Sequence, residues 1–306
     1  MPLYKYLNAE RVDVLDKLKI RITQPSALND PFESLPMIEK IMEEGDFYSL
    51  INDQVEKSEL RETVKETIEK ELSPYKKFIN TDLFESDEFI DVIMENFDSL
   101  TRPFIKEALN PENLNQSYSE NFKKSFSNTF GVLSLTQNPD NLLMWSHYCD
   151  SHRGFLIGLD QNSPFFDQRI NDIDTIRKLK NVQYVSQRPQ IDKLFKSEKV
   201  DRDDYLEEIM NLFFLTKSDT WTYEKEMRIV LPLENANETF EMANGEKVYL
   251  IDIPSSIIKS VVYGSQINEK TENRISEILN RDKFDHVKIF RSELDMNNFK
   301  VNIINA

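Results

Sequence analysis

One segment of the sequence, residues 217–232, combines acidic, basic and aromatic side chains that can do chemistry together: Lys217, Trp221, Glu224, Glu226 and Arg228. In an extended strand, side chains two positions apart point to the same face, so Glu224, Glu226 and Arg228 are predicted to share one face of an internal strand. Two carboxylates and a guanidinium on a buried face are costly unless they are paired or used. The pattern therefore indicates either a functional site or a structural pair, Glu226–Arg228 or Glu224–Arg228, on a solvated face.

A second group of polar residues follows a predicted strand near the start of the chain and consists of Asn29, Asp30 and Glu33. Asn and Asp before a proline favour a turn, which by itself accounts for this segment. Binding residues often lie on such connections, because a rigid scaffold positions them. Asp30 and Glu33 are therefore also candidates to present carboxylates at the end of the strand.

The third group lies in residues 145–154, which hold two of the three histidines and one of the two tryptophans. His147 and His152 are five positions apart, about 140° around a straight helix, so one helix cannot bind a metal with both. Trp145, Tyr148 and His152 follow helical spacing, which places them on one helix face. That face is predicted either to form an aromatic wall for a planar ligand or to pack into the core.

Hydrophobic patterning predicts the elements that must position these groups. Strands are predicted over residues 3–7, 20–23, 130–135, 154–159, 182–185, 227–231, 247–251, 258–263, 286–290 and 299–304. Helices are predicted over residues 9–19, with Asn8 as the cap, and over residues 140–150, 187–197, 203–215 and 269–281. Several strands adjoin without an intervening helix, which favours an α+β fold with a mixed or antiparallel central sheet and flanking helices.

Residues 36–127 differ from the rest of the chain, with 21 acidic and 11 basic residues that supply −10 of the net charge of −16. Amphipathic spacing predicts three helices, over residues 47–72, 82–100 and 113–127. We therefore expect an acidic helical insertion between the two pieces of a core domain, residues 1–35 and 128–306. The insertion is expected to be a lid or a surface for a protein partner or acceptor, or else structural padding.

Composition argues against several classes of protein. With 38 Lys and Arg against 54 Asp and Glu, the chain is not expected to bind nucleic acid through its phosphates, although nucleic acid stays possible as a substrate. No apolar run is long enough for a membrane span and the first residues do not resemble a secretory signal, so a cytoplasmic protein is expected. The motifs of Rossmann dehydrogenases, P-loop NTPases, zincins and α/β-hydrolases are absent from the sequence. The one cysteine, Cys149, is expected to be buried and structural.

These motifs together resemble a bacterial family catalogued as domain of unknown function 2971. The resemblance rests on residues 3–6, 29–33, 144–148, 221–228 and 262–264, with His152 and Gly154. It covers residues 3–33 and about 130–300, and it leaves the acidic insertion outside. No activity is established for that family, so the resemblance implies no reaction.

A second resemblance is to ADP-ribosyltransferases. Glu224-Lys-Glu226 before a strand looks like their E-x-E turn, and Ser134-Leu-Thr136 is similar to their Ser-Thr-Ser strand. The resemblance implies an enzyme that cleaves the nicotinamide–ribose bond of NAD, as a transferase or glycohydrolase. That such an enzyme acts as a bacterial toxin or phage-defence effector is a hypothesis about its context, and no residue of the sequence indicates it. Glu226 would face the positive charge that develops on the ribose, and Glu224 would position the acceptor. Further implied contacts are stacking by Trp145, Tyr148 or Trp221 and diphosphate binding by Lys5, Arg21 or Arg228.

Two other functions stay open. A metal-dependent nuclease or phosphodiesterase would hold a divalent metal with Asp30, Glu33, Glu224 and Glu226 and would use His147 or Lys217 as acid or base. A non-catalytic sensor would bind a nucleotide-like ligand and contact a partner through the insertion. The transferase would be favoured if one cleft were lined by Ser134, Glu226 and either Trp145 or Tyr148. The metal enzyme would be favoured if the carboxylates surrounded an empty space large enough for a metal ion.

Overall fold

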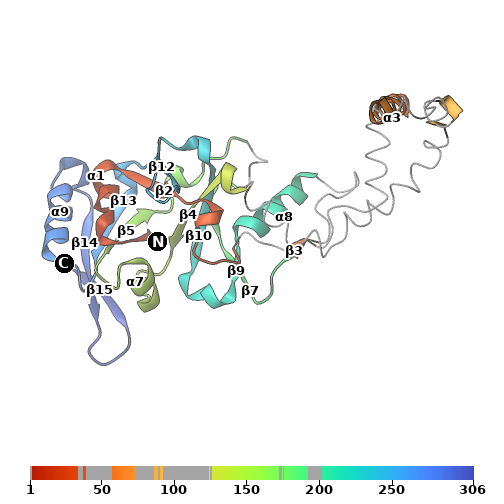
Figure 1. The fold of residues 1–306 in the computed structure, drawn as a ribbon. Helices are drawn as coiled ribbons and strands as arrows, with labels where there is room; N and C mark the ends of the chain where they lie inside the picture. Colours follow the sequence, from red (N-terminus) through yellow and green to blue (C-terminus); the bar gives the residue numbers. More distant parts are fainter. Residues whose placement is uncertain are drawn as a thin grey trace. The chain divides into compact units, whose positions relative to one another are not determined.

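The computed structural model describes residues 2–33, 37–38, 57–73, 86–88, 90–91, 124, 126–171, 174, 176–191 and 202–306. The chain divides into two compact units, of which the first comprises residues 1–36, 121–189 and 202–306 and the second residues 37–120 and 190–201. Figure 1 shows the elements of the first unit around one large sheet.

Eight strands form the central sheet of the first unit. In spatial order they are β15 (Val301–Asn305), β14 (Lys288–Leu294), β13 (Ile258–Tyr263), β5 (Phe155–Asp160), β1 (Pro2–Leu7), β4 (Phe130–Thr136), β10 (Glu226–Pro232) and β6 (Lys180–Asn181). Neighbouring strands are antiparallel except for β13 and β14, which run parallel. The prediction of an α+β fold with a mixed, mainly antiparallel sheet is confirmed.

Two smaller sheets contain the other strands described in this unit. One contains β11 (Glu238–Glu241), β12 (Lys247–Asp252) and β2 (Lys19–Ile22), and the other pairs β7 (Gln183–Val185) with β9 (Thr216–Ser218). Strands β9 and β11 were not expected from the sequence. Their few residues are largely polar, so they lack the apolar alternation that predicts a strand.

The helices of the first unit include α7 (Leu142–Tyr148), α8 (Arg202–Phe214) and α9 (Glu269–Leu279), close to their predicted positions. The side chain of Asn141 caps α7 by accepting from the Met144 backbone, and Asn268 caps α9 in the same way. The predicted helix over residues 9–19 is shorter and split into the 3-10 turn η1 (Ala9–Val12) and α1 (Asp13–Lys17), and Asn8 makes no side-chain cap.

The described part of the second unit contains α3 (Lys57–Leu72) and a parallel pair of two-residue strands, β3 (Met37–Ile38) and β8 (Gln190–Ile191). Helix α3 agrees with the second part of the helix predicted over residues 47–72. The helix predicted over residues 187–197 is wrong at β8, and its remainder lies outside the described residues. Most of the predicted insertion also lies outside them. Among the described residues, no helix is long and apolar enough to cross a membrane.

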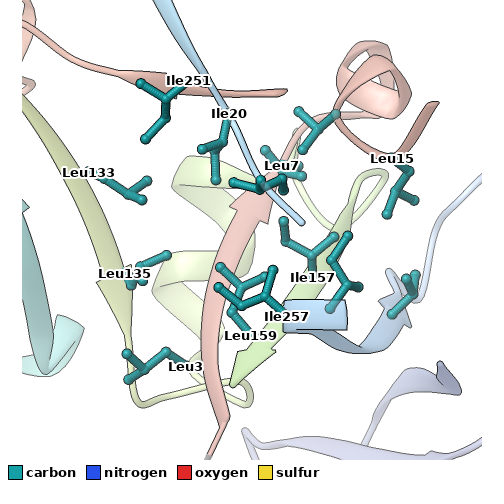
Figure 2. Packing of buried hydrophobic residues seen from close by; sticks show 14 of the residues in the cluster. Leu3, Leu7, Leu15, Ile20, Leu133, Leu135, Ile157, Leu159, Ile251 and Ile257 are labelled. Atoms are coloured by element: carbon teal, nitrogen blue, oxygen red, sulfur yellow. The ribbon is translucent and has the colours of Figure 1, made fainter. Parts of the chain in front are cut away.

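One face of the central sheet packs into the main hydrophobic core. Leu7 of β1, Leu135 of β4 and Ile157 of β5 point together into this core (Figure 2). Because side chains alternate along a strand, the residues next to these three on each strand point to the opposite face of the sheet. That face carries a smaller apolar cluster: Tyr6, Met144, Trp145, Cys149, Leu156, Val262 and Val301. As predicted, Cys149 is buried and free.

Candidate active site

Two adjacent strands, β4 and β10, bring the polar side chains of the site together. They pair antiparallel, with Arg228 opposite Ser134 and Glu226 opposite Thr136. Ile229 packs into the main core, so alternation directs Glu226 and Arg228 to the other face of the sheet. Strand β10 is internal, between β4 and β6, and both charged side chains are therefore buried.

Five buried charged residues meet on this face and form what we call the ion cluster: Glu33, Lys217, Glu224, Glu226 and Arg228. Arg228 is only 1% exposed. Its Nε donates to Glu226 Oε1 at 2.7 Å and its Nη2 donates to Glu226 Oε2 at 2.8 Å, a bidentate contact. Nη2 also donates to Glu33 Oε1, and Nη1 donates to the Phe214 carbonyl oxygen at 2.8 Å. The guanidinium thus joins β10 to the turn that holds Glu33.

Lys217, on β9, is the second cation of the ion cluster. Its Nζ lies 2.7 Å from Glu224 Oε2, 3.3 Å from Glu226 Oε2 and 3.5 Å from Glu33 Oε1. It also lies 4.8 Å from the centre of the Trp221 ring, within the range of a cation–π contact. Lys217 therefore bridges all three carboxylates of the cluster.

Glu224 reaches the cluster from outside the strand. It ends the 3-10 helix η5 (Asp219–Glu224), and Lys225 follows with a left-handed φ of 42°. The prediction that Glu224 and Glu226 belong to one strand is therefore wrong, because Lys225 separates η5 from β10. The two carboxylates converge all the same, through their common contact with Lys217.

Tyr148, at the end of α7, holds the other oxygen of Glu224. Its hydroxyl donates to Glu224 Oε1 at 2.6 Å and accepts from Asn29 Nδ2 at 2.8 Å. The pKa of Tyr148 is raised well above its ordinary value, mainly by burial and secondly by the hydrogen bond to Glu224. The hydroxyl therefore stays protonated and remains a donor.

Charge pairing also fixes the protonation of Glu226 and Lys217. Burial by itself raises the pKa of Glu226, but Arg228 and Lys217 more than offset that effect and hold the pKa at about 2. Burial lowers the pKa of Lys217, and the three glutamates raise it above its ordinary value. Glu226 and Lys217 are therefore both charged at neutral pH.

A cavity of about 240 Å³ opens against the ion cluster. Strands β1 and β4 pair at one position, where Tyr4 lies opposite Thr136. Next to this pair, the Lys5 side chain connects the two strands by donating from Nζ to the Ser134 carbonyl oxygen at 2.9 Å. We call this space the first cavity, and its lining residues include predicted site residues from five segments of the chain: Lys5, Asn29, Ser134, Tyr148, Lys217, Glu224, Glu226 and Arg228.

Lys5 differs from Lys217 and Arg228 because its pKa is lowered toward neutral pH. Desolvation lowers the pKa of Lys5 to about 8, and the negative charge of Glu226 offsets part of that decrease. Arg11, Arg21 and Arg228 lower the pKa further. Lys5 thus places at the wall of the first cavity an amine that is mostly protonated at neutral pH and loses its proton more readily than an ordinary lysine.

Trp145 and His152 lie away from the first cavity. Trp145 is fully buried, its Nε1 donates to the Pro139 carbonyl oxygen at 2.8 Å, and its ring stacks on His152 at 6.0 Å between ring centres. The predicted common helix face is wrong for His152, because α7 ends at Tyr148 and His152 adopts a left-handed φ of 68°. Of the two alternatives for Trp145, packing describes the structure.

His147 and Arg21 are also outside the first cavity. His147 is exposed on α7. Arg21 lies on β2, where its guanidinium pairs with Glu246. Asp30 is buried, and its Oδ1 accepts from the Phe32 backbone at 2.9 Å. Asp30 and Glu33 line a neighbouring cavity rather than this one.

Sequence reasoning missed several residues that line the first cavity: Tyr4, Tyr6, Thr23, Ala27, Leu28, Leu135, Thr136 and Met144. It also missed Tyr184, whose hydroxyl accepts from the Glu226 backbone at 2.9 Å. Thr136 and Tyr4 share a sheet face with Glu226, so strand alternation could have identified them once the pairing of strands was known.

The described residues contain no group of three or more His, Cys, Asp or Glu side chains arranged to hold a metal ion. The carboxylates of the ion cluster do converge, but they surround the Lys217 amine and the Arg228 guanidinium. A divalent metal would have to displace a cation that already contacts each of them.

A comparison with protein families finds one similarity. The sequence model of a family described as "Protein of unknown function (DUF2971)" matches residues 144–229. The matched segment contains Tyr148, Lys217, Glu224, Glu226 and Arg228, which are most of the charged and hydroxyl groups of the site. No curated protein and no solved structure matches the chain.

Proposed function

We propose that this protein is an NAD-consuming enzyme that cleaves the bond between nicotinamide and ribose, as a glycohydrolase or an ADP-ribosyltransferase. The observation that carries the proposal is that Ser134, Tyr148, Glu224 and Glu226 line one cavity. Cavities of about 150 Å³ accept a single aromatic ring, so a volume of about 240 Å³ suits the nicotinamide–ribose end of NAD rather than the whole dinucleotide.

Glu226 would supply the main electrostatic contribution. When the glycosidic bond breaks, its electron pair moves to the ring nitrogen of nicotinamide and positive charge develops on the ribose. A carboxylate whose pKa is held at about 2 is ionised at neutral pH. Because Arg228 and Lys217 fix its position, the charge needs no reorganisation as the transition state forms.

Glu224 and Lys5 would have separate tasks. Glu224 would position the water or hydroxyl that attacks the ribose carbon, and its orientation is fixed by Tyr148 and Lys217. Lys5, at the wall of the first cavity, would contact the diphosphate in its protonated form. The remainder of NAD would then extend out of the cavity. An activity of this kind would suit a bacterial toxin or defence effector.

A second candidate is a sensor that binds a nucleotide-like ligand without cleaving it. One observation favours it: every carboxylate oxygen of Glu224 and Glu226 already accepts a hydrogen bond from Tyr148, Lys217 or Arg228. A carboxylate neutralised in this way stabilises positive charge on a ligand less strongly. The sensor predicts NAD binding with no release of nicotinamide.

The two candidates are separated by one assay. Purified protein is incubated with NAD, with and without cell extract as a source of acceptors, and nicotinamide is measured by chromatography while binding is measured by calorimetry. Release of nicotinamide supports the enzyme, and binding without release supports the sensor. If NAD neither binds nor is cleaved under both conditions, the proposal is wrong.

A further inference from the structure

Strand β15 forms one end of the central sheet, and no described strand pairs with its outer side. It pairs with β14 over all five of its residues, and the register of the pair is regular. The other end of the sheet is β6, which has two residues and carries Lys180. Short or charged edge strands discourage further pairing, whereas a longer regular edge leaves its backbone groups available. Strand β15 is therefore the end at which another strand could be added.

The hydrogen bonds to β14 show which backbone groups of β15 point outward. Ala306, directly after β15, donates its N–H to the Ile289 carbonyl oxygen at 3.2 Å. In an antiparallel pair every second residue exchanges hydrogen bonds with the partner strand, so alternate residues of β15 also bond to β14. The residues between them direct their N–H and C=O groups away from the sheet: Val301, Ile303 and Asn305.

Strand β15 also lacks the features that protect an edge strand. Its sequence, Val-Asn-Ile-Ile-Asn, contains no charged residue and no proline, in a chain whose net charge is −16. The Ile304 side chain is 39% exposed. The turn between β14 and β15, at the end of the hairpin in Figure 1, carries Met296 and Phe299, and both side chains are almost fully exposed. An uncharged edge next to exposed apolar side chains is typical of an interaction surface.

A second copy of the same strand fits this edge. Antiparallel pairing about a two-fold axis at Ile303 lets the outward backbone groups of each copy meet those of the other. Ile303 then lies opposite its own copy, and Val301 lies opposite Asn305 of the second copy. Because Ile303 packs against the smaller apolar cluster, the axis brings two apolar side chains together. On the other face, Ile304 lies opposite Asn302 of the second copy, so no like charges meet.

The charges on β14 agree with this register. Arg291 is the cross-strand neighbour of Ile304, and Glu293 is the cross-strand neighbour of Asn302. In the two-fold arrangement, a row of side chains across the four strands therefore begins with Arg291 of one copy and ends with Glu293 of the other. Arg291 also pairs with Glu272 of its own chain, so these rows select the register more than they add affinity. This complementarity favours a second copy over a strand of unrelated sequence.

We infer that the protein forms a two-fold dimer through β15, which joins two eight-stranded sheets into one continuous sheet. An interface made mainly of one strand from each copy is small, so the dissociation constant is expected to be about 10–100 µM. The inference goes beyond the proposed reaction and does not depend on it, because neither β14 nor β15 lines the first cavity.

Sedimentation equilibrium of the full chain, from about 1 to 500 µM, measures the association. Ile303→Pro removes an outward N–H and leaves the bonds to β14 in place, so it is expected to weaken the dimer at least about tenfold. Asn305→Pro removes another outward N–H at an exposed side chain and should weaken the dimer in the same direction. Circular dichroism checks the fold of both variants.

Cross-linking tests the register itself. Ile303→Cys places two introduced thiols opposite each other with Cα atoms about 5.5 Å apart, a spacing that a disulfide can bridge. Asn305→Cys is the matched control, because its side chain is more exposed but lies about 13 Å along the strand from its own copy. Under mild oxidation at about 200 µM, Ile303→Cys should form a covalent dimer at least about tenfold faster than Asn305→Cys. The unmodified protein should form none, because its Cys149 is buried.

Three results would overturn the inference. The first is a monomer at every concentration, which would leave the edge to a different partner. The second is a dimer whose affinity is unchanged in both proline variants. The third is cross-linking of Ile303→Cys that is no faster than that of Asn305→Cys, which would show that the two strands do not meet about this axis.

Discussion

Arg228 binds both carboxylate oxygens of Glu226, two positions earlier on the same strand, with Nε at 2.7 Å and Nη2 at 2.8 Å. Neighbours at this spacing share a face of β10, so the sequence itself sets up the pair. The same guanidinium reaches Glu33, which lies 195 positions away in the chain. Arg228 therefore links β10 to the turn that carries Glu33 and holds the charge of Glu226 in place.

Arg228→Met is expected to destabilise the protein by about 3–5 kcal/mol, because it leaves Glu33 and Glu226 buried with one cation fewer. The comparison is Arg21→Met, which removes a half-exposed pair with Glu246 and should cost about 0–1 kcal/mol. Urea unfolding of both variants measures the free energies. Equal losses would show that the buried cluster contributes no more than a surface pair.

The stability contribution of Glu226 should depend on pH. Its folded-state pKa of about 2 is below the ordinary value of 4.5, so the folded protein holds the charge that the unfolded chain gives up as pH falls. The contribution is complete above about pH 4.5 and is lost as pH decreases toward 2. The difference in unfolding free energy between the unmodified protein and Glu226→Gln should therefore shrink between about pH 5.5 and 3.5. A difference that stays constant or grows would contradict the low pKa.

Lys5 should titrate well below an ordinary lysine. After reductive methylation with a ¹³C label, its NMR signal in the folded protein should report a pKa of about 8, against 10.5 as the ordinary value in urea. Glu226 raises this pKa, so Glu226→Gln should lower it further. A pKa that rises in the variant, or a folded value near 10.5, would show that Lys5 is hydrated rather than desolvated between β1 and β4.

Tyr148→Phe should weaken the site through one missing hydroxyl. The variant leaves the buried Glu224 Oε1 without its donor at 2.6 Å and should cost about 1–3 kcal/mol in urea unfolding. It should also slow nicotinamide release, because Glu224 loses a contact that orients it. Tyr4→Phe is the control, since Tyr4 lines the same cavity but has no contact with a carboxylate among the described residues. Equal effects of the two variants would argue against a special role for Tyr148.

Local patterns were sufficient for much of the fold. Alternation predicted the strand that carries Glu226 and Arg228, and short apolar runs predicted its neighbour β4. Helices α7 and α9 lie close to the helices predicted over residues 140–150 and 269–281, whereas Asn8, the one cap that was predicted, makes no side-chain hydrogen bond. These features depend on residues close together in the sequence, so the sequence of this chain alone is sufficient to predict them.

The composition of the site could be predicted only in part. Strand alternation indicated the pairing of Glu226 with Arg228, but it could not show that Glu33 and Lys217 meet them, because those contacts depend on how distant segments pack. The left-handed conformation of Lys225 has no signal in the residue type, and it places Glu224 outside the strand. Trp145 had the spacing of a ligand contact, yet the packing of α7 buries it completely.

The measurement that tests the central claim most directly is the rate of nicotinamide release from NAD by the unmodified protein and by Glu226→Gln. Calorimetry and thermal melting should first show that the variant is folded and still binds NAD at the assay temperature. We predict release by the unmodified protein and a rate at least about a hundredfold lower in the variant, the effect of removing a positioned charge at a transition state. Equal rates in the two proteins, or no release by either, would contradict the assignment of Glu226 to the cleavage of this bond.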